Sequence, residues 1–145
     1  MPMKLDVVTI EREVFKADDV DMVILPGTEG EMGVLPRHEP LMSGLKEGVL
    51  EIVRGNEREI LAIGGGFVEV RNSHVIVMAD VAEQSDEIDV ERAEAARRKA
   101  IATIENAPEN MEREEALASL RRAEVRLKAA KRRSGGGGSV RVSDH

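Results

Sequence analysis

The sequence contains no cysteine, tryptophan or tyrosine, and two phenylalanines are its only aromatic residues. A chain without cysteine has no disulfide, no thiolate metal site and no cysteine nucleophile. Base-stacking nucleic-acid platforms need more aromatic side chains than two. No apolar run approaches the roughly 20 residues of a membrane span, and the start, Met1-Pro2-Met3-Lys4, resembles neither a signal peptide nor a transit peptide. We therefore expect a cytoplasmic chain of 145 residues with one domain, or one small domain with an appendage, and no direct membrane span.

Charge is distributed unevenly along the chain. The net charge is −7, but residues 1–89 hold 19 acidic and 8 basic residues, a net charge of −11. Residues 90–145 hold 9 acidic and 13 basic residues, a net charge of +4. Seven basic residues and one acid lie between Arg121 and Arg133. A split of this kind indicates two segments with different partners.

Short runs of β-forming residues separated by turn residues fill the first half of the chain. Arg54-Gly55-Asn56-Glu57 and Arg71-Asn72-Ser73-His74 each lie between two such runs and predict hairpin turns. Gly64-Gly65-Gly66 predicts a tight bend or bulge. Residues 27–33 are also glycine-rich, but no helix follows them, so they indicate turns rather than a phosphate-binding loop. Many short strands with regular turns predict a β-sandwich or a β-barrel.

Alanine, glutamate, arginine and lysine dominate the second half. Their run predicts helices over residues 90–106 and 111–132, with Asp89 and Asn110 as N-caps. The short break at residues 107–110 joins the two helices as an antiparallel hairpin.

The apolar stripes of this hairpin are narrow and consist mostly of alanine. Burying one methyl group yields about 0.8 kcal/mol, against about 1.5–3 kcal/mol for a leucine side chain. Such helices form easily because their intrinsic propensity is high, but we expect them to attach weakly and to dock in more than one place. The glycine-rich residues 134–145 predict a flexible tail, to which we assign no function.

Candidate catalytic groups are few. Outside the tail, His38 and His74 are the only histidines, and a metal site needs three or four converging ligands. His38 and Glu39 are adjacent and would point to opposite sides of a strand. No serine lies in a nucleophile-elbow pattern. The sequence therefore predicts no catalytic residue and no metal site.

Four basic residues converge if the two predicted helices pair antiparallel. Arg122 and Arg126 are one turn apart on the second helix, while Arg92 lies one turn into the first helix and Lys99 two turns further. Guanidinium pairs suit phosphate because they are planar, permanently charged and bidentate. The alternative interpretation is a solvated helix face with glutamate–arginine pairs, which are common and worth little.

Two motifs resemble the epsilon subunit of the F-type ATP synthase of bacteria and chloroplasts. One is Gly30-Glu31-Met32-Gly33-Val34-Leu35-Pro36-Arg37-His38-Glu39-Pro40-Leu41, and the other is Gly65-Gly66-Phe67-Val68-Glu69-Val70. The resemblance covers roughly residues 4–132. It implies an α+β fold, with an N-terminal antiparallel β-sandwich over residues 1–86 that binds the rotor. A regulatory, antiparallel two-helix hairpin over residues 87–133 would follow at the C-terminus.

The resemblance also implies a non-catalytic central-stalk subunit of the proton-translocating enzyme, held peripherally at the cytoplasmic face of the cell membrane. The sandwich would bind the gamma subunit and the c ring, and Glu31, His38 and Leu41 match positions that make these rotor contacts. An extended hairpin would reach the alpha/beta catalytic head and inhibit ATP hydrolysis, with basic residues meeting an acidic segment of the beta subunit. The candidates for that inhibitory contact are Arg121, Arg122, Arg126 and Lys128.

Some bacterial members of this family bind ATP in the folded hairpin through a motif of Ile or Leu, Asp, two variable residues, Arg and Ala. Residues 88–93 match this motif. Lys99 stands where well-known binders have an arginine, and lysine keeps the charge but loses the bidentate fork. ATP would be a regulatory ligand, and no cofactor would be required. The nucleotide-binding residues implied in this way are Glu83, Ile88, Asp89, Arg92, Ala93, Lys99, Arg122 and Arg126.

The sequence leaves three rival functions open. A free-standing ATP sensor would use the same helical motif but leaves residues 30–41 unexplained. A small metal-dependent enzyme would need a cluster of ligands or nucleophiles. Binding of DNA through the basic helix is disfavoured by the acidic first half and the scarcity of aromatic residues.

Overall fold

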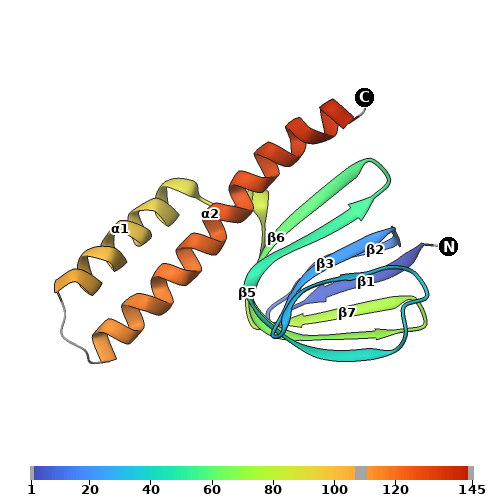
Figure 1. Ribbon diagram of the computed structural model, residues 1–145, viewed down its shortest axis with the longest axis horizontal. Coiled ribbons are helices and arrows are strands. Elements are labelled where there is room, and N and C mark those ends of the chain that lie inside the picture. Colours follow the sequence, from blue (N-terminus) through green and yellow to red (C-terminus); the bar gives the residue numbers. More distant parts are fainter. Residues whose placement is uncertain (1, 107–110, 144–145) are drawn as a thin grey trace.

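The computed structural model describes residues 2–106 and 111–143 of the chain. Within this part, strands come first and helices follow, as predicted (Figure 1). The strands are β1 (Met3–Val8), β2 (Glu13–Val20), β3 (Met22–Gly27), β4 (Gly30–Val34), β5 (Leu41–Arg54), β6 (Glu57–Arg71), β7 (His74–Ala79) and β8 (Ala82–Gln84). A short 3₁₀ helix, η1 (Ser85–Glu87), leads into the helices α1 (Val90–Asn106) and α2 (Met111–Ser143).

All strands belong to one hydrogen-bonded sheet in the order β2-β1-β7-β6-β5-β3-β4, with β8 paired to β6. Every pair is antiparallel except β1 with β7, which is parallel. The sheet folds over to form the two layers of a β-sandwich, and the predicted fold class is confirmed. The parallel pair is the one departure from a wholly antiparallel sandwich.

The long strands β5 and β6 cross from one layer to the other. In the C-terminal half of β5, Leu50 and Ile52 point into the core, whereas in its N-terminal half the inward positions are Leu41 and Leu45. Odd-numbered residues of β5 therefore point inward in its N-terminal half, and even-numbered residues point inward in its C-terminal half. Gly66 of β6 lies at the same crossing with φ of +133°, and a Cβ there would collide with the carbonyl oxygen of Met78. The bend predicted at the three glycines is confirmed, and only glycine fits it.

Both predicted hairpin turns are present. Gly55 turns the chain between β5 and β6 with φ of +59°, and Asn72 and Ser73 join β6 to β7 with φ of 52° and 57°. Two positive φ values in a two-residue loop match the twist of the flanking strands. Residues 27–33 were expected to form turns, but the turn is limited to Thr28 and Glu29, and β4 begins at Gly30.

Large aliphatic side chains fill the space between the two layers. Leu5, Leu25, Leu50, Leu61 and Ile63 are each at most 2% exposed. This core contains residues of the sheet alone and none of the helices. The sandwich therefore has its own continuous hydrophobic core.

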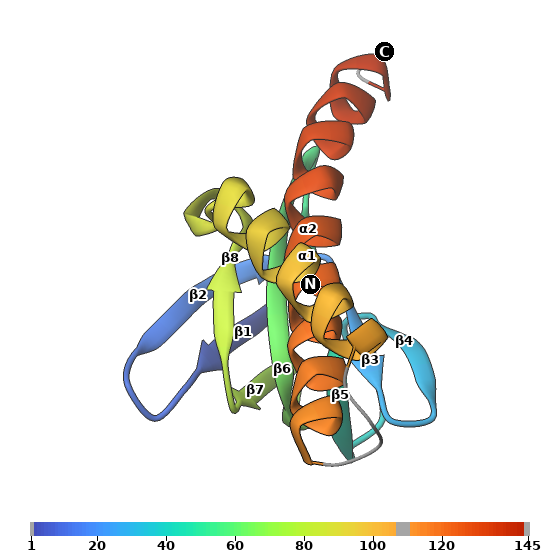
Figure 2. The ribbon, with the colours of Figure 1, turned by 90° about the vertical axis from the view of Figure 1, so that its left-hand side faces the viewer.

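The two helices form the predicted antiparallel hairpin on the outside of the sandwich. Figure 2 shows α1 lying over α2, and α2 packs on the outer side of β5 and β6. The cluster at this contact is small. It consists of Val49, Ile60, Ala62, Ile88, Ala129 and Ala130, with Val125 at its edge.

The helix boundaries agree with the sequence at three ends and differ at the fourth. Asp89 caps α1 as predicted, because its Oδ1 accepts a hydrogen bond from the Arg92 amide at 3.2 Å. The predicted cap Asn110 lies outside the described residues. α2 continues to Ser143, through most of the residues for which the sequence predicts a flexible tail. Glycine lowers helix stability by about 1 kcal/mol relative to alanine, but a nucleated helix extends one hydrogen bond at a time without a new nucleus.

Candidate functional site

The residues that match the nucleotide motif surround the start of α1. Ile88 is 8% exposed and belongs to the cluster between hairpin and sandwich, and Ala93 is fully buried. The Ala93 amide donates to the backbone oxygen of Asp89 at 3.0 Å, beside the cap described above. Three motif residues therefore fix where α1 leaves the sandwich. The fourth, Arg92, has an exposed side chain.

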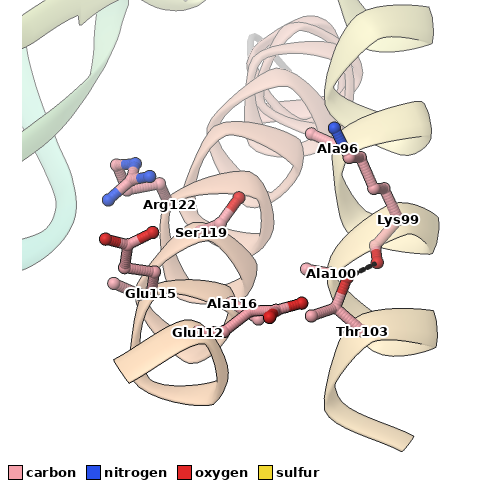
Figure 3. Close-up of a pocket in the computed structure, with 10 residues that line it drawn as sticks. Ala96, Lys99, Ala100, Thr103, Glu112, Glu115, Ala116, Ser119 and Arg122 are labelled. Atoms are coloured by element: carbon pink, nitrogen blue, oxygen red, sulfur yellow. Dashed lines mark hydrogen bonds between the residues drawn. The ribbon is translucent and has the colours of Figure 1, made fainter. Parts of the chain in front are cut away.

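Residues of both helices line a hollow of about 580 Å³ (Figure 3). Lys99 reaches it from α1, and Arg122, Glu112 and Glu115 reach it from α2. The Thr103 hydroxyl, also on its wall, donates to the backbone oxygen of Lys99 at 3.0 Å. The hollow is thus lined by one cation from each helix, by two carboxylates of α2 and by alanines of both helices.

A second hollow of about 550 Å³ lies where the hairpin meets the sandwich. Three arginines line it, Arg12 from the sandwich and Arg122 and Arg126 from α2, together with Glu83 of β8. Arg126 donates two hydrogen bonds to the Glu83 carboxylate, from Nε to Oε1 at 2.9 Å and from Nη2 to Oε2 at 3.1 Å. Arg122 lines both hollows and links them.

The structure gathers only some of the predicted nucleotide-binding side chains. Glu83, Arg122 and Arg126 share the second hollow, and Lys99 and Arg122 both line the first. Arg92 lines neither hollow. The sequence analysis missed Arg12, because only tertiary contact brings the β1–β2 loop beside the hairpin.

Arg12 is held in place from two sides. The Thr9 hydroxyl accepts a hydrogen bond from the Arg12 amide at 3.2 Å, which closes the β1–β2 turn. The Arg12 guanidinium donates two hydrogen bonds to the Glu87 carboxylate of η1, from Nη2 to Oε1 at 3.0 Å and from Nη1 to Oε2 at 3.3 Å. The bonds from Arg12 and from the Gln84 amide lower the pKa of Glu87, and Glu87 in turn raises the pKa of Arg12. Both groups are therefore charged at neutral pH.

Basic residues of α2 meet acidic residues of the sandwich along the whole docking contact. Besides Arg126 with Glu83, Arg121 lies 3.3 Å from Glu47 and Arg132 lies 3.4 Å from Glu51. Glu51 is 8% exposed and is also paired with Arg58 of β6. The acidic first half and the basic second half of the sequence are thus paired with each other within the same chain. Of the predicted inhibitory residues, Arg121 and Arg126 are engaged in these bridges, while Arg122 and Lys128 are exposed.

The predicted rotor-contact residues occupy the edge of the sandwich. Glu31 is exposed on β4 at one end of the sheet, and Leu41 opens β5 and packs partly against the core. His38 lies in the loop between them, with Nδ1 2.8 Å from the backbone oxygen of Glu39. Glu31 is therefore exposed, and His38 and Leu41 are partly exposed.

A set of large apolar side chains next to Leu41 points outward. Met42 is 66% exposed, Phe67 58% and Met78 43%. Phe67 lies opposite Met78 across the β6–β7 pair, and Met42 lies on the neighbouring strand β5, so the three share one surface, here called the apolar face. The sequence analysis did not select them, because which β6 residues point outward depends on the glycine bend.

Two further features bear on the class of protein. Within residues 2–106 and 111–143, no three His, Cys, Asp or Glu side chains gather closely enough to hold a metal ion. In the part of the chain that the structure describes, neither helix combines the length and the apolar character needed to cross a membrane.

Comparison with known families divides the chain where the structure does. Residues 2–85 match the family described as ATP synthase, Delta/Epsilon chain, beta-sandwich domain. Residues 86–131 match ATP synthase, Delta/Epsilon chain, long alpha-helix domain. The two matches cover the sandwich and most of the hairpin.

Curated relatives and solved structures agree with these matches. An ATP synthase epsilon chain of Dehalococcoides mccartyi is 48% identical over 132 residues, 90% of this chain and 94% of that protein. One of Desulforamulus reducens is 42% identical over 127 residues, 88% of this chain and 96% of that protein. A chain in the mitochondrial ATP synthase of Euglena gracilis (OSCP/F1/c-ring) superposes with a TM-score of 0.78 at 28% identity, covering 89% of this chain and 81% of that one. On this evidence the chain belongs to the family of ATP synthase delta/epsilon chains.

Proposed function

We propose that the chain is the epsilon subunit of a proton-translocating F-type ATP synthase and acts without catalysing a reaction itself. It joins the gamma subunit to the c ring in the central stalk, at the cytoplasmic face of the membrane. The observation that carries the proposal is an independent sandwich with an unpartnered apolar face, bearing a hairpin attached through a small contact.

The apolar face is the part of the sandwich suited to a permanent partner. Contiguous exposed apolar patches on a protein surface mark interaction sites. Met42, Phe67 and Met78 form such a patch directly beside Leu41. In this proposal gamma covers the apolar face, and the edge with Glu31 and His38 meets the c ring.

The hairpin is the part suited to reversible regulation. Its cluster with the sandwich includes three alanines, and its bridges have partly exposed arginines. When the hairpin extends, Arg121 and Arg126 lose their glutamate partners and become available, with Arg122 and Lys128, to an acidic segment of the beta subunit. That contact with the alpha/beta head inhibits ATP hydrolysis.

ATP is proposed as the ligand that favours the folded hairpin. The linked hollows bring Lys99, Arg122 and Arg126 together in the folded form, and a ligand that binds one conformation shifts the population toward it. ATP would thereby oppose inhibition. Calorimetry tests this step: Lys99→Arg, which supplies a bidentate fork, is expected to tighten ATP binding. Unchanged affinity in both Arg92→Ala and Arg126→Ala would show that the site is wrongly assigned.

Co-purification from membranes of the source cell tests the rotor role. The tagged chain is expected to recover gamma, alpha, beta and the c ring, identified by mass spectrometry. Met42→Asp with Phe67→Asp is expected to lose them, whereas Ile10→Asp, at an exposed apolar residue outside the apolar face, keeps them. A chain that binds ATP but recovers none of these subunits would instead be a free-standing ATP sensor.

ATP hydrolysis by the same membranes tests the inhibitory role. Lys128 is exposed and has no ion-pair partner among the described residues, so Lys128→Gln leaves the folded form intact. It is expected to raise hydrolysis at low ATP. Lys131→Gln, an equally exposed change three residues further along α2, serves as the control. Equal hydrolysis in the two variants would remove Lys128 from the inhibitory contact.

A further inference from the structure

The second hollow contains a cation that neither helix supplies. Arg12 lies on its wall with Arg122 and Arg126, although it belongs to the β1–β2 loop of the sandwich. A ligand held only by α1 and α2 would join the helices to each other. It would not by itself hold them against the sandwich.

We propose that Arg12 is a third phosphate-binding arginine, so that the phosphate chain of a bound nucleotide bridges the sandwich and the hairpin. The inference rests on the proposed ATP site and adds a residue to it. It explains how ligand binding selects the docked hairpin, because only the docked form places Arg12 beside Arg122 and Arg126.

The position of Arg12 supports this role. The Thr9 turn fixes its backbone, and its guanidinium lies close enough to Glu83 for that carboxylate to act on it electrostatically. Glu83 in turn pairs with Arg126. Arginine offers planar bidentate recognition of phosphate oxygens, which a lysine does not.

Arg12 has a resting partner that a ligand must displace or share. In the structure its guanidinium is hydrogen-bonded to Glu87, and the Arg12 side chain is about half exposed. The exchange of one carboxylate for a phosphate needs only a side-chain movement. The Glu87 carboxylate keeps a second partner, the Gln84 amide at 2.9 Å.

This arrangement gives a test in which a ligand role and a structural role predict opposite results. If Arg12 binds the ligand, Arg12→Gln weakens binding and Glu87→Gln strengthens it, because glutamine no longer competes for the guanidinium. If the Arg12–Glu87 bridge matters only for the fold, both substitutions weaken binding together. Glu87→Gln keeps an oxygen that can accept from the Gln84 amide.

The experiment is ATP titration of the full chain by calorimetry at fixed pH and salt. Arg12→Gln is expected to weaken ATP binding on the order of tenfold, as for the loss of one charge-assisted hydrogen-bonded contact. Glu87→Gln is expected to tighten it. Arg71→Gln, which removes an exposed arginine bridged to Glu69 at 2.7 Å on the sandwich, is the matched control and is expected to bind as the unaltered chain does.

Hydrogen exchange of α2 supplies a second readout. ATP is expected to slow exchange of the amides around Ala123 and Ala129 in the unaltered chain and to slow it less in Arg12→Gln at saturating ATP. Inorganic tripolyphosphate distinguishes a nucleotide from a free phosphate chain. ATP is expected to bind more tightly, and equal affinity would reject the nucleotide as the occupant.

Three results would overturn the inference, and they differ in what else fails. Equal ATP affinity in Arg12→Gln and the unaltered chain rejects Arg12 but leaves the ATP site standing. Weaker binding in both Arg12→Gln and Glu87→Gln reduces the bridge to a structural role. Absence of ATP binding in the unaltered chain rejects the ATP site itself, while the rotor role still depends on the co-purification.

Discussion

The sandwich core and the contact between hairpin and sandwich are built from different residues. Leucine, isoleucine and valine fill the core, almost all of them completely buried. Alanine provides much of the docking contact, and glutamate–arginine bridges line its edge. A buried leucine stabilises by about 1.5–3 kcal/mol, and an alanine methyl by about 0.8 kcal/mol. From this difference we expect the hairpin to detach at a free energy well below that of unfolding the sandwich.

The helices themselves are not equivalent in this contact. α2 lies against β5 and β6, whereas α1 packs chiefly on α2. The segment that leads into α1 is tied to the sandwich through Ile88, one residue before the cap Asp89. We therefore expect both helices to leave the sheet together if α2 detaches, with the start of α1 as the hinge.

The largest expected effect comes from the core. Leu50 is fully buried on β5 and lies opposite Leu61 of β6. Leu50→Ala is expected to lower the free energy of unfolding by about 2–5 kcal/mol, because it removes methyl groups and leaves a cavity. Urea denaturation measures this. Met42→Ala on the exposed apolar face should stay within about 0.5 kcal/mol of the unaltered chain, and equal losses in the two variants would contradict the assignment of the core.

The next effect separates the two regions directly. Ala129 of α2 is fully buried in the cluster against the sheet. Ala129→Leu is expected to weaken docking by about 1–3 kcal/mol through overpacking, while the sandwich keeps its stability. Hydrogen exchange should then be faster along α2 and unchanged in β1 and β7. Lys128→Leu places the same side chain on the exposed side of the helix and should leave exchange as it was.

A failure of the Ala129→Leu prediction would take a definite form. If β1 and β7 exchanged faster together with α2, hairpin and sandwich would be one cooperative unit. The docking contact would then not be a separate, weaker region.

A smaller effect is expected from the buried carboxylate of the docking contact. Glu51 holds Arg132 of α2 and Arg58 of β6, and both arginines are partly exposed. Glu51→Gln is expected to weaken docking by about 1 kcal/mol, because the charge-assisted bonds are lost but the arginines regain water. Hydrogen exchange of α2 measures it. Glu57→Gln, at the exposed β5–β6 turn, makes the same chemical change and is expected to alter nothing.

The sequence was sufficient for those parts of the fold that depend on local pattern. Hairpin turns at residues 54–57 and 71–74, the cap at Asp89 and the start of α1 at Val90 all follow from neighbouring residues. The bend at the three glycines was also predictable. The side chains that the bend turns outward were not predictable, because they depend on which layer of the sandwich each half of β6 joins. For that reason the apolar face was missed.

The candidate site shows the same limit more strongly. Glu83, Arg122 and Arg126 were predicted from positions that correspond in the family, and the structure brings them together. Arg12 and Glu51 carry no local signal for these contacts, because Glu87 and Arg132 lie 75 and 81 residues away from them in the chain. Arg92 belongs to the motif at residues 88–93, yet it lines neither hollow. Pairing across the docked interface is tertiary information that helical spacing does not contain.

The smallest expected effect compares one exposed ion pair from each region. Arg54 lowers the pKa of Asp19 within the sandwich, and Arg12 lowers the pKa of Glu87 beside the hairpin, in both cases chiefly through side-chain hydrogen bonds. A carboxyl whose pKa is depressed in the folded state stabilises that state above its unfolded pKa. This stabilisation is lost as the pH falls through the lower, folded value. NMR titration of the carboxyl groups is expected to show both pKa values below the ordinary ones.

Substitution of each arginine by glutamine should bring back the ordinary pKa of its own partner only. Arg54→Gln should act on Asp19 and leave Glu87 unchanged, and Arg12→Gln should act on Glu87. Because Gln84 also donates to Glu87, the pKa of that carboxyl should recover less completely than that of Asp19. A full recovery at Glu87 would mean that the Gln84 bond opens together with the bridge. The hydrogen bonds at the junction between sandwich and hairpin would then open more easily than those within the sandwich.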